Sequence, residues 1–444
     1  MRLIVTRLTI RWQVYVLKDT WRDERRALEG ELLEMIGDCE GVAQLHSYCS
    51  VTIDGQTDTT HSLIRRDLVV ADTPRSIETN QEQTKPSAEA PNYRPNSPDG
   101  ERSGTTRYLP DQDFLPPLAL EQGLPPLRKV HSRLVVRTYG WPIKYALSPA
   151  ELLCVVADAV RGHKNSYSRD ILHRDVSEGN ILVMPVMVNG KRVFKGVLID
   201  YDNAIKFSTH QTLADDPASG TRPFMSGELL QQWPYFVKPG EMSAPRHDAI
   251  HDLESFLWVL VYICLSRDGP AHRRREIWDN SKETQLLRDN WRALFEGENL
   301  LLAERKQTLI RNRDDFAFRV LRFLPVYYKP LEEVLRKLRD ILETAYRSRE
   351  FNNVHEDFIE AMEAARLGLE PITDPKHIAL QEREIERRRT DDGRTGEISP
   401  TSKGMNMGTA ASGSTASHGL QEPESPTPKR TKSTSDMLEL PSAR

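Results

Sequence analysis

The segment from His173 to Asp200 contains, in order, the side-chain types that a phosphoryl-transfer site requires. Asp175 follows His173 and Arg174, Asn180 comes four residues after Val176, and Asp200 follows an apolar run. A carboxylate can orient a hydroxyl nucleophile and accept its proton, whereas an amide oxygen and a second carboxylate suit Mg²⁺. The spacing therefore predicts Asp175 as the catalytic base, and Asn180 and Asp200 as metal ligands.

Four stretches carry related motifs in order: HRDVSEGNILV at 173–183, LIDYDNA at 198–204, GTRPFMSGELL at 220–230 and HDLESFLWVL at 251–260. Together they resemble the fungal-type protein kinase family, and the resemblance covers roughly residues 12–50 and 130–350. It implies an α+β, bilobal protein-kinase-like fold with a small β-rich lobe and a large, mainly helical lobe. It also implies an enzyme that uses ATP and Mg²⁺ to phosphorylate Ser or Thr hydroxyls of a protein substrate.

The resemblance assigns roles to residues outside the first motif. Asp252 would hold the backbone of the catalytic loop, and Ser226-Gly227-Glu228 stand where many kinases have Ala-Pro-Glu. Arg174 belongs to the predicted catalytic set, because an arginine beside the base can pair with a phosphorylated residue of the activation segment. The candidate phosphorylation sites are Ser208, Thr209, Thr212, Ser219 and Thr221.

Alternating apolar residues from Leu8 to Val16 predict one half-buried strand that ends at Lys18. By the same resemblance, Lys18 would contact the α and β phosphates of the nucleotide, although a strand-end lysine can also simply face solvent. Its expected partner is Glu29 on the following helix, with Glu31 as the alternative, because apolar residues recur three, four and seven positions after Glu29.

Glycine is missing where kinases place a glycine-rich hairpin over the phosphates, since Gly30 is the first glycine of the chain. Either the chain is an N-terminally truncated kinase or the hairpin is dispensed with. Two substitutions also depart from common kinases. Ser177 stands where serine/threonine kinases carry a lysine, and Asp202 occupies the glycine position of Asp-Phe-Gly.

The apolar run Arg133 to Val136 leads into a turn at Thr138, Tyr139 and Gly140. These three residues are predicted to line the adenine-binding hinge, although a core strand ending in a turn has the same pattern. A capping box at 148–151 then predicts a helix, on which His163 is expected to be structural. Further helices are predicted from the apolar periodicity of 250–264 and 331–345.

Composition changes along the chain predict its domain organisation. Residues 1–72 would form a partial small lobe, 73–107 a disordered insertion, 108–147 the end of the small lobe and the hinge, 148–368 the large lobe, and 369–444 a disordered tail. The tail contains the basic clusters 387–389 and 428–432, which resemble nuclear-import signals although clusters this small are mostly incidental.

The net charge of −4 provides no basic field, so we expect no nucleic-acid partner. No apolar run approaches the ~20 residues of a membrane span, and the N-terminus does not resemble a secretory signal. The four cysteines are widely spaced, which is typical of reduced thiols in an intracellular protein of the cytoplasm or nucleus.

Three functions remain open at this point: an active protein kinase, a catalytically weak kinase-like scaffold, and a small-molecule phosphotransferase. The missing glycine hairpin and Asp202 favour the scaffold. The segment from Gly220 to Glu228 argues against the small-molecule enzyme, because it resembles the peptide-docking segment of protein kinases.

Overall fold

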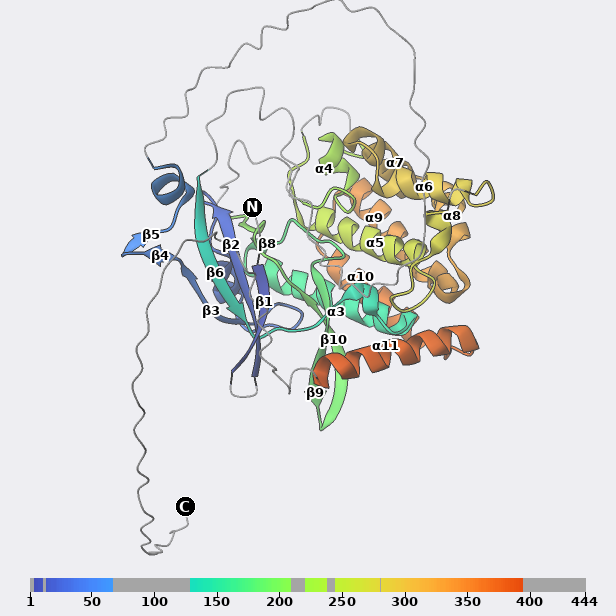
Figure 1. The fold of residues 1–444 in the computed structure, drawn as a ribbon. Coiled ribbons are helices and arrows are strands. Elements are labelled where there is room, and N and C mark those ends of the chain that lie inside the picture. The colour runs from blue at the N-terminus through green and yellow to red at the C-terminus, as the bar shows by residue number, and fades with distance from the viewer. Residues whose placement is uncertain are drawn as a thin grey trace, which may run out of the picture. The chain divides into compact units, whose positions relative to one another are not determined.

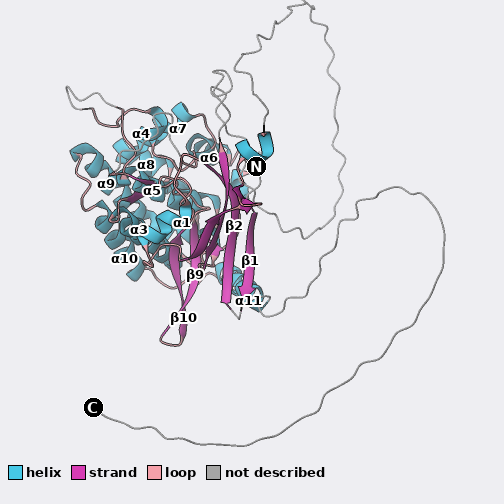
Figure 2. Ribbon diagram, turned by 90° about the vertical axis from the view of Figure 1, so that its left-hand side faces the viewer, coloured by secondary structure: helices cyan, strands magenta, loops and turns pink. Residues whose placement is uncertain are grey.

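The computed structural model describes residues 4–10, 13–66, 128–208, 220–237, 244–279 and 281–393. It is a mixed α+β structure in which the N-terminal part consists mainly of β-sheet and the C-terminal part is mostly helical. Figure 1 shows this division along the chain, and Figure 2 shows the strands gathered beside the helices.

The N-terminal sheet contains four antiparallel strands in the order β1-β2-β6-β3. Their bounds are Ile4–Ile10 for β1, Gln13–Asp23 for β2, Leu45–Ser50 for β3 and Lys129–Val136 for β6. Helix α1, Glu29–Ile36, connects β2 to β3. Beside the sheet lie the short hairpin β4, Thr52–Ile53, and β5, Gln56–Thr57, and the π-helix η1, Thr60–Arg65.

The single strand expected from Leu8 to Lys18 is wrong, because these residues belong to the two strands of a hairpin. Ile10 pairs with Gln13, and Lys18 lies opposite Val5. Both strands of a hairpin alternate with a period of two residues, so periodicity does not reveal the reversal of the chain.

A second sheet, in the order β10-β9-β7, connects the hinge segment to the residues before Asp200. Its strands are β7, Trp141–Pro142, β9, Ile181–Val188, and β10, Lys191–Leu198, while β8, Ile171–Leu172, pairs with β11, Ile205–Lys206. The amide of Ala43 donates to Leu198 O at 3.1 Å, and the amide of Leu198 donates to Gly41 O at 2.8 Å. These bonds fix the loop between α1 and β3 against the strand that leads into Asp200.

The helical part begins where the capping sequence predicted. Ser148 is the N-cap of α3, and its hydroxyl accepts the Glu151 amide at 3.0 Å. The α-helices are α3, Pro149–Tyr167; α4, Gly227–Gln231; α5, Ala249–Ser266; α6, Gln285–Phe295; α7, Asn299–Arg311; α8, Arg313–Arg319; α9, Glu332–Ser348; α10, Val354–Leu367; and α11, Pro375–Gly393. The 3-10 turns are η2, Ile143–Tyr145; η3, Arg275–Ile277; η4, Leu321–Phe323; and η5, Val326–Leu331.

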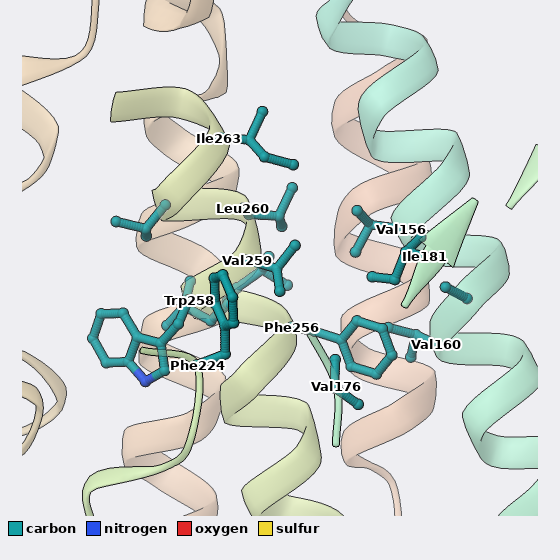
Figure 3. Close-up of a cluster of buried hydrophobic side chains, with 14 of the residues drawn as sticks. Val156, Val160, Val176, Ile181, Phe224, Phe256, Trp258, Val259, Leu260 and Ile263 are labelled. Atoms are coloured by element: carbon teal, nitrogen blue, oxygen red, sulfur yellow. The ribbon is translucent and has the colours of Figure 1, made fainter. Parts of the chain in front are cut away.

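Helix α5 lies at the centre of the core. It is long and apolar enough to cross a membrane, but 94% of its 18 residues are buried within the fold, as in the core helix of a globular domain. Figure 3 shows the Phe256 ring directed from α5 toward Val160 of α3 and toward Val176, which follows the predicted base. The central helix thus supports the loop that carries Asp175.

Helix α11 corrects the expected C-terminal tail. The composition of residues 369–444 predicts disorder, yet 375–393 form a helix on which Arg388 is 3% exposed. The basic cluster 387–389 therefore belongs to a helix in which Arg388 is buried and Arg389 is exposed. The predicted disordered insertion 73–107 and the cluster 428–432 lie outside the described residues.

Candidate active site

Lys18 is the centre of a cluster of carboxylates. Its Nζ atom lies 2.7 Å from Glu29 Oε2, 2.7 Å from Asp200 Oδ1 and 2.7 Å from Asp202 Oδ2. The four residues come from β2, from the first turn of α1 and from the segment after β10. Burial alone would lower the pKa of Lys18, but Asp200, Glu29 and Asp202 outweigh it and raise that pKa well above its usual value. Lys18 is therefore a buried cation.

Glu29 connects the lysine to the segment around Asp200. Its Oε2 accepts from Lys18, while its Oε1 accepts the backbone amide of Tyr201 at 2.8 Å. Burial raises the pKa of Glu29 to about 8, and the negative charges of Asp202 and Asp200 add to this rise against the attraction of Lys18. The alternative partner, Glu31, instead receives the Leu28 amide at the N-terminus of α1.

The loop of the predicted base is anchored from beneath by α5. Arg174 has a left-handed backbone with φ of 68°, and its amide donates to Asp252 Oδ2 at 2.9 Å. Two imidazoles also bind this carboxylate, His163 at 2.9 Å and His247 at 2.8 Å. Although burial would raise the pKa of Asp252, these histidines hold it well below its usual value. Asp252 thus occupies the expected position, and an anionic carboxylate stabilises the strained turn.

Both carboxylate oxygens of Asp175 are held by donors. The amide and the hydroxyl of Thr221 each donate to Oδ1 at 2.8 Å, and Asn203 Nδ2 donates to Oδ2 at 3.0 Å. Asn203 in turn accepts from Arg26, which follows β2. The orientation of the carboxylate therefore depends on residues from three separate parts of the chain.

Asn180 and Asp200 provide oxygen donors that fit a magnesium ion. Asn180 Nδ2 donates to Asp175 O at 2.8 Å, so its amide oxygen is the atom left to face a ligand. The Ile199 amide donates to Asn180 O at 2.9 Å, which ties Asn180 to the residue before Asp200. Carboxylate oxygens of Glu29, Asp200 and Asp202 lie within 4.8 Å of one another. Hard oxygen donors of this kind are the ligands that Mg²⁺ prefers.

The three predicted hinge residues connect β6 to β7. Thr138 is buried, and its hydroxyl accepts the Gln44 amide at 2.7 Å, so its side chain supports the hinge from inside. A Cβ atom at Gly140 would lie 2.6 Å from Val183 O, which explains the glycine between the two sheets. Tyr139 packs edge-on against Trp141 at a centroid distance of 6.2 Å.

The predicted activation segment ends in a buried polar network. Glu228 is fully buried and contacts His251 at 3.3 Å and Arg349 at 3.4 Å. Lys306 of α7, also fully buried, donates to the carbonyls of Pro223 and Met225. Burial lowers the pKa of Lys306 to about 7 against the attraction of Glu254.

The candidate phosphorylation sites differ in their surroundings. Ser208 donates to Asp170, and the hydroxyl of Thr221 donates to Asp175. Arg174, the predicted partner of a phosphorylated residue, is buried. Thr209, Thr212 and Ser219 lie outside the described residues.

Sequence reasoning gave no role to Asn203, Arg26, His247 or Lys306. Asn203 lies within the LIDYDNA motif, so its closeness to Asp200 was a usable signal. Lys306 and His247 carried no such signal, because they reach the site only through the packing of α7 and of the segment before α5.

Comparison with known proteins agrees with the motifs. No curated protein matches the chain. A model of the fungal protein kinase family matches residues 2–264, which span more than half of the 444 residues and include every predicted site residue. The chain therefore belongs to the fungal protein kinase family.

Proposed function

We propose that the chain is a protein kinase that transfers the γ-phosphate of Mg²⁺-ATP to Ser or Thr hydroxyls of a protein, on a bilobal kinase-like fold. The observation that carries this proposal is the approach of Lys18 to 2.7 Å from both Glu29 and Asp200. A phosphate-binding cation, the acid that orients it and a metal-binding carboxylate thus lie in one place, as phosphoryl transfer requires.

The residues divide the reaction between them. Lys18 binds the nucleotide phosphates and Glu29 holds the ammonium in position, while the segment from Thr138 to Gly140 receives the adenine. Magnesium held by Asp200 and Asn180 would neutralise charge on the phosphates. Asp175 orients the acceptor hydroxyl and takes its proton.

The protein substrate is proposed from the surroundings of Asp175. Thr221 binds the base directly, and the residues after it are held by the buried Lys306 and Glu228. A rigid backbone segment beside the base gives an acceptor peptide a surface on which to lie. All four cysteines are free thiols, which supports an intracellular location.

The second candidate function is a kinase-like scaffold, and Asp202 is the observation that favours it. Its Oδ2 atom lies 2.7 Å from Nζ of Lys18, the residue proposed to bind phosphate, and Glu29 and Asp200 lie at the same distance. A nucleotide must therefore compete with an internal anion for Lys18.

Phosphoryl transfer from labelled ATP by the full chain separates the two functions. In an enzyme, Asp175→Asn keeps nucleotide affinity but lowers transfer by about 10² or more, because the base contacts the hydroxyl rather than the nucleotide. Asp289→Asn, which changes an exposed carboxylate on α6, is the matched control and leaves transfer unchanged. Equal, substantial transfer by wild type and Asp175→Asn would remove Asp175 from the reaction, and transfer by neither would favour the scaffold.

A further inference from the structure

Helix α11 lies against the chain segment that follows the proposed adenine-binding residues. Figure 1 shows the C-terminal end of this helix, in red, beside β9 and β10. Helix α11 lies outside the residues matched by the family model, which end at 264. The contacts of this helix therefore belong to a part of the chain to which the family match assigns no role.

Arg388 is the anchor of the contact. It is 3% exposed, and its guanidinium donates to Glu151 Oε1 at 3.1 Å and to Glu151 Oε2 at 2.9 Å. It also donates to the carbonyl of Tyr145 and to Glu384 Oε1 at 3.2 Å. Such a bidentate, planar pair is specific for arginine. One side chain thus connects α11 to η2 and to the first turn of α3.

The same guanidinium stacks against aromatic rings of the second sheet. It lies 5.2 Å from the ring centroid of Trp141 and 4.7 Å from that of Phe194. The indole Nε1 of Trp141 donates to Asp391 Oδ2 at 3.2 Å. Trp141 directly follows Gly140, so α11 holds the residue at the end of the proposed hinge.

Two further contacts fix the entry to α3. Gln381 Nε2 donates to Leu147 O at 2.8 Å, and Tyr327 donates to the same carbonyl at 2.8 Å. Arg387 covers the ring of Tyr145 at 4.2 Å from its centroid. Contacts from α11 therefore recur along the whole segment from Trp141 to Glu151.

We propose that α11 is a clamp on the hinge, and that Arg388 is a positioning residue for nucleotide binding. The inference rests on the proposed function, since Thr138 to Gly140 are assigned to the adenine by it. Arg388 contacts no substrate. It acts by fixing the backbone from Trp141 to Leu147, so that the preceding hinge groups are held in place before the nucleotide arrives.

The test compares Arg388→Ala with Arg389→Ala in the full chain. Arg389 is the next residue on the same helix, but its side chain is 73% exposed and pairs with the exposed Glu386 one turn away. Arg388→Ala should raise KM for ATP by about tenfold while kcat changes by less than about twofold, because the clamp affects binding and not the transfer step. Arg389→Ala should leave both constants unchanged.

Hydrogen–deuterium exchange provides a readout that does not depend on nucleotide. Exchange in the peptide covering 141–147 should increase in Arg388→Ala, including the Ala146 amide that donates to Ile143 O at 2.9 Å. Trp141→Phe, which removes the donor to Asp391 and part of the ring surface under Arg388, should have an effect of the same kind. Arg388→Lys should rescue only partly, since an ammonium cannot form the bidentate pair.

Each outcome decides the inference. Unchanged exchange in 141–147 or an unchanged KM in Arg388→Ala would overturn it. A loss of kcat with faster exchange throughout the chain would also overturn it, because that result indicates general destabilisation. If the wild type neither binds ATP nor transfers its phosphate, the proposed function fails, and the nucleotide role of Arg388 fails with it. Exchange in 141–147 then still decides whether α11 clamps that segment.

Discussion

Replacing Asp202 by Asn should strengthen the binding of metal-free ATP, because it removes an internal competitor for Lys18. Asp202 Oδ2 lies 2.7 Å from Lys18 Nζ, and its side chain is 32% exposed. A hydrogen bond to a charged group contributes about 1.5–3 kcal/mol when buried, whereas exposed ion pairs contribute about 0.2–1 kcal/mol. Because Asp202 has an intermediate exposure, its ion pair with Lys18 should contribute about 1–1.4 kcal/mol. Removing the pair therefore corresponds to an affinity for metal-free ATP about five- to tenfold higher.

Isothermal titration calorimetry with ATP in EDTA measures this change directly. Asp315→Asn is the matched control, because Asp315 carries the same charge, is 31% exposed and pairs with Arg319 on α8, which is remote in sequence from Lys18. The control should bind ATP with the affinity of the wild type.

Repeating the titration with Mg²⁺ distinguishes two roles of Asp202. A pure counter-ion of Lys18 gives tighter binding in both conditions, whereas a metal ligand gives tighter binding in EDTA and weaker binding with Mg²⁺. An unchanged or lower affinity in EDTA would refute the reasoning, since it would mean that Asp202 does not compete with the phosphates.

Two further predictions concern stability. Asp252→Asn should lower the free energy of unfolding by about 3 kcal/mol, because it removes the buried anion that binds His163, His247 and the Arg174 amide. Urea unfolding followed by circular dichroism measures this free energy, and the control Asp289→Asn, at an exposed position, should change it by less than about 0.5 kcal/mol. Equal stability of the two variants would contradict the anchoring role of Asp252. The second concerns Glu29, whose pKa is raised by burial to about 8 from an ordinary value of 4.5. The folded protein binds this proton more tightly than the unfolded chain, so the contribution is complete below pH 4.5 and is lost as pH rises toward about 8. Glu29→Gln should remove this part of the decline, and a stability difference between wild type and variant that stays flat across that range would count against it.

Local patterns predicted much of the helical part. Ser148 and Pro149 mark the start of α3, and the apolar periodicity of 250–264 marks α5, since capping and helical spacing depend only on neighbouring residues. The hairpin of β1 and β2 was missed, because alternation is the same on either side of a reversal. Helix α11 was missed because its charged sequence is stabilised by contacts with distant residues such as Glu151.

The features of the candidate site likewise divide into those that the sequence predicted and those that appeared only in the structure. Asp175, Asn180 and Asp200 were predicted from residue type and spacing, whereas Lys18 and Glu29 were predicted from the family resemblance. The structure brings Lys18 together with Glu29 and Asp200. The contact of Asp202 with Lys18 was not predicted, since the sequence showed only that Asp202 stands at the glycine position of Asp-Phe-Gly. Thr138, predicted at the hinge, turns its hydroxyl to Gln44 instead of toward a ligand.

The order and types of the motif residues were enough to identify the family, which the family model over residues 2–264 confirms, and to predict which residues form the site. The orientation and the charge of those groups depend on the tertiary structure. Thr221 and Asn203 orient Asp175 from positions far along the chain, and burial among three carboxylates sets the charge of Lys18. Orientation and pKa depend on through-space distances and on exclusion of water, and neither quantity is encoded in the local order of residues.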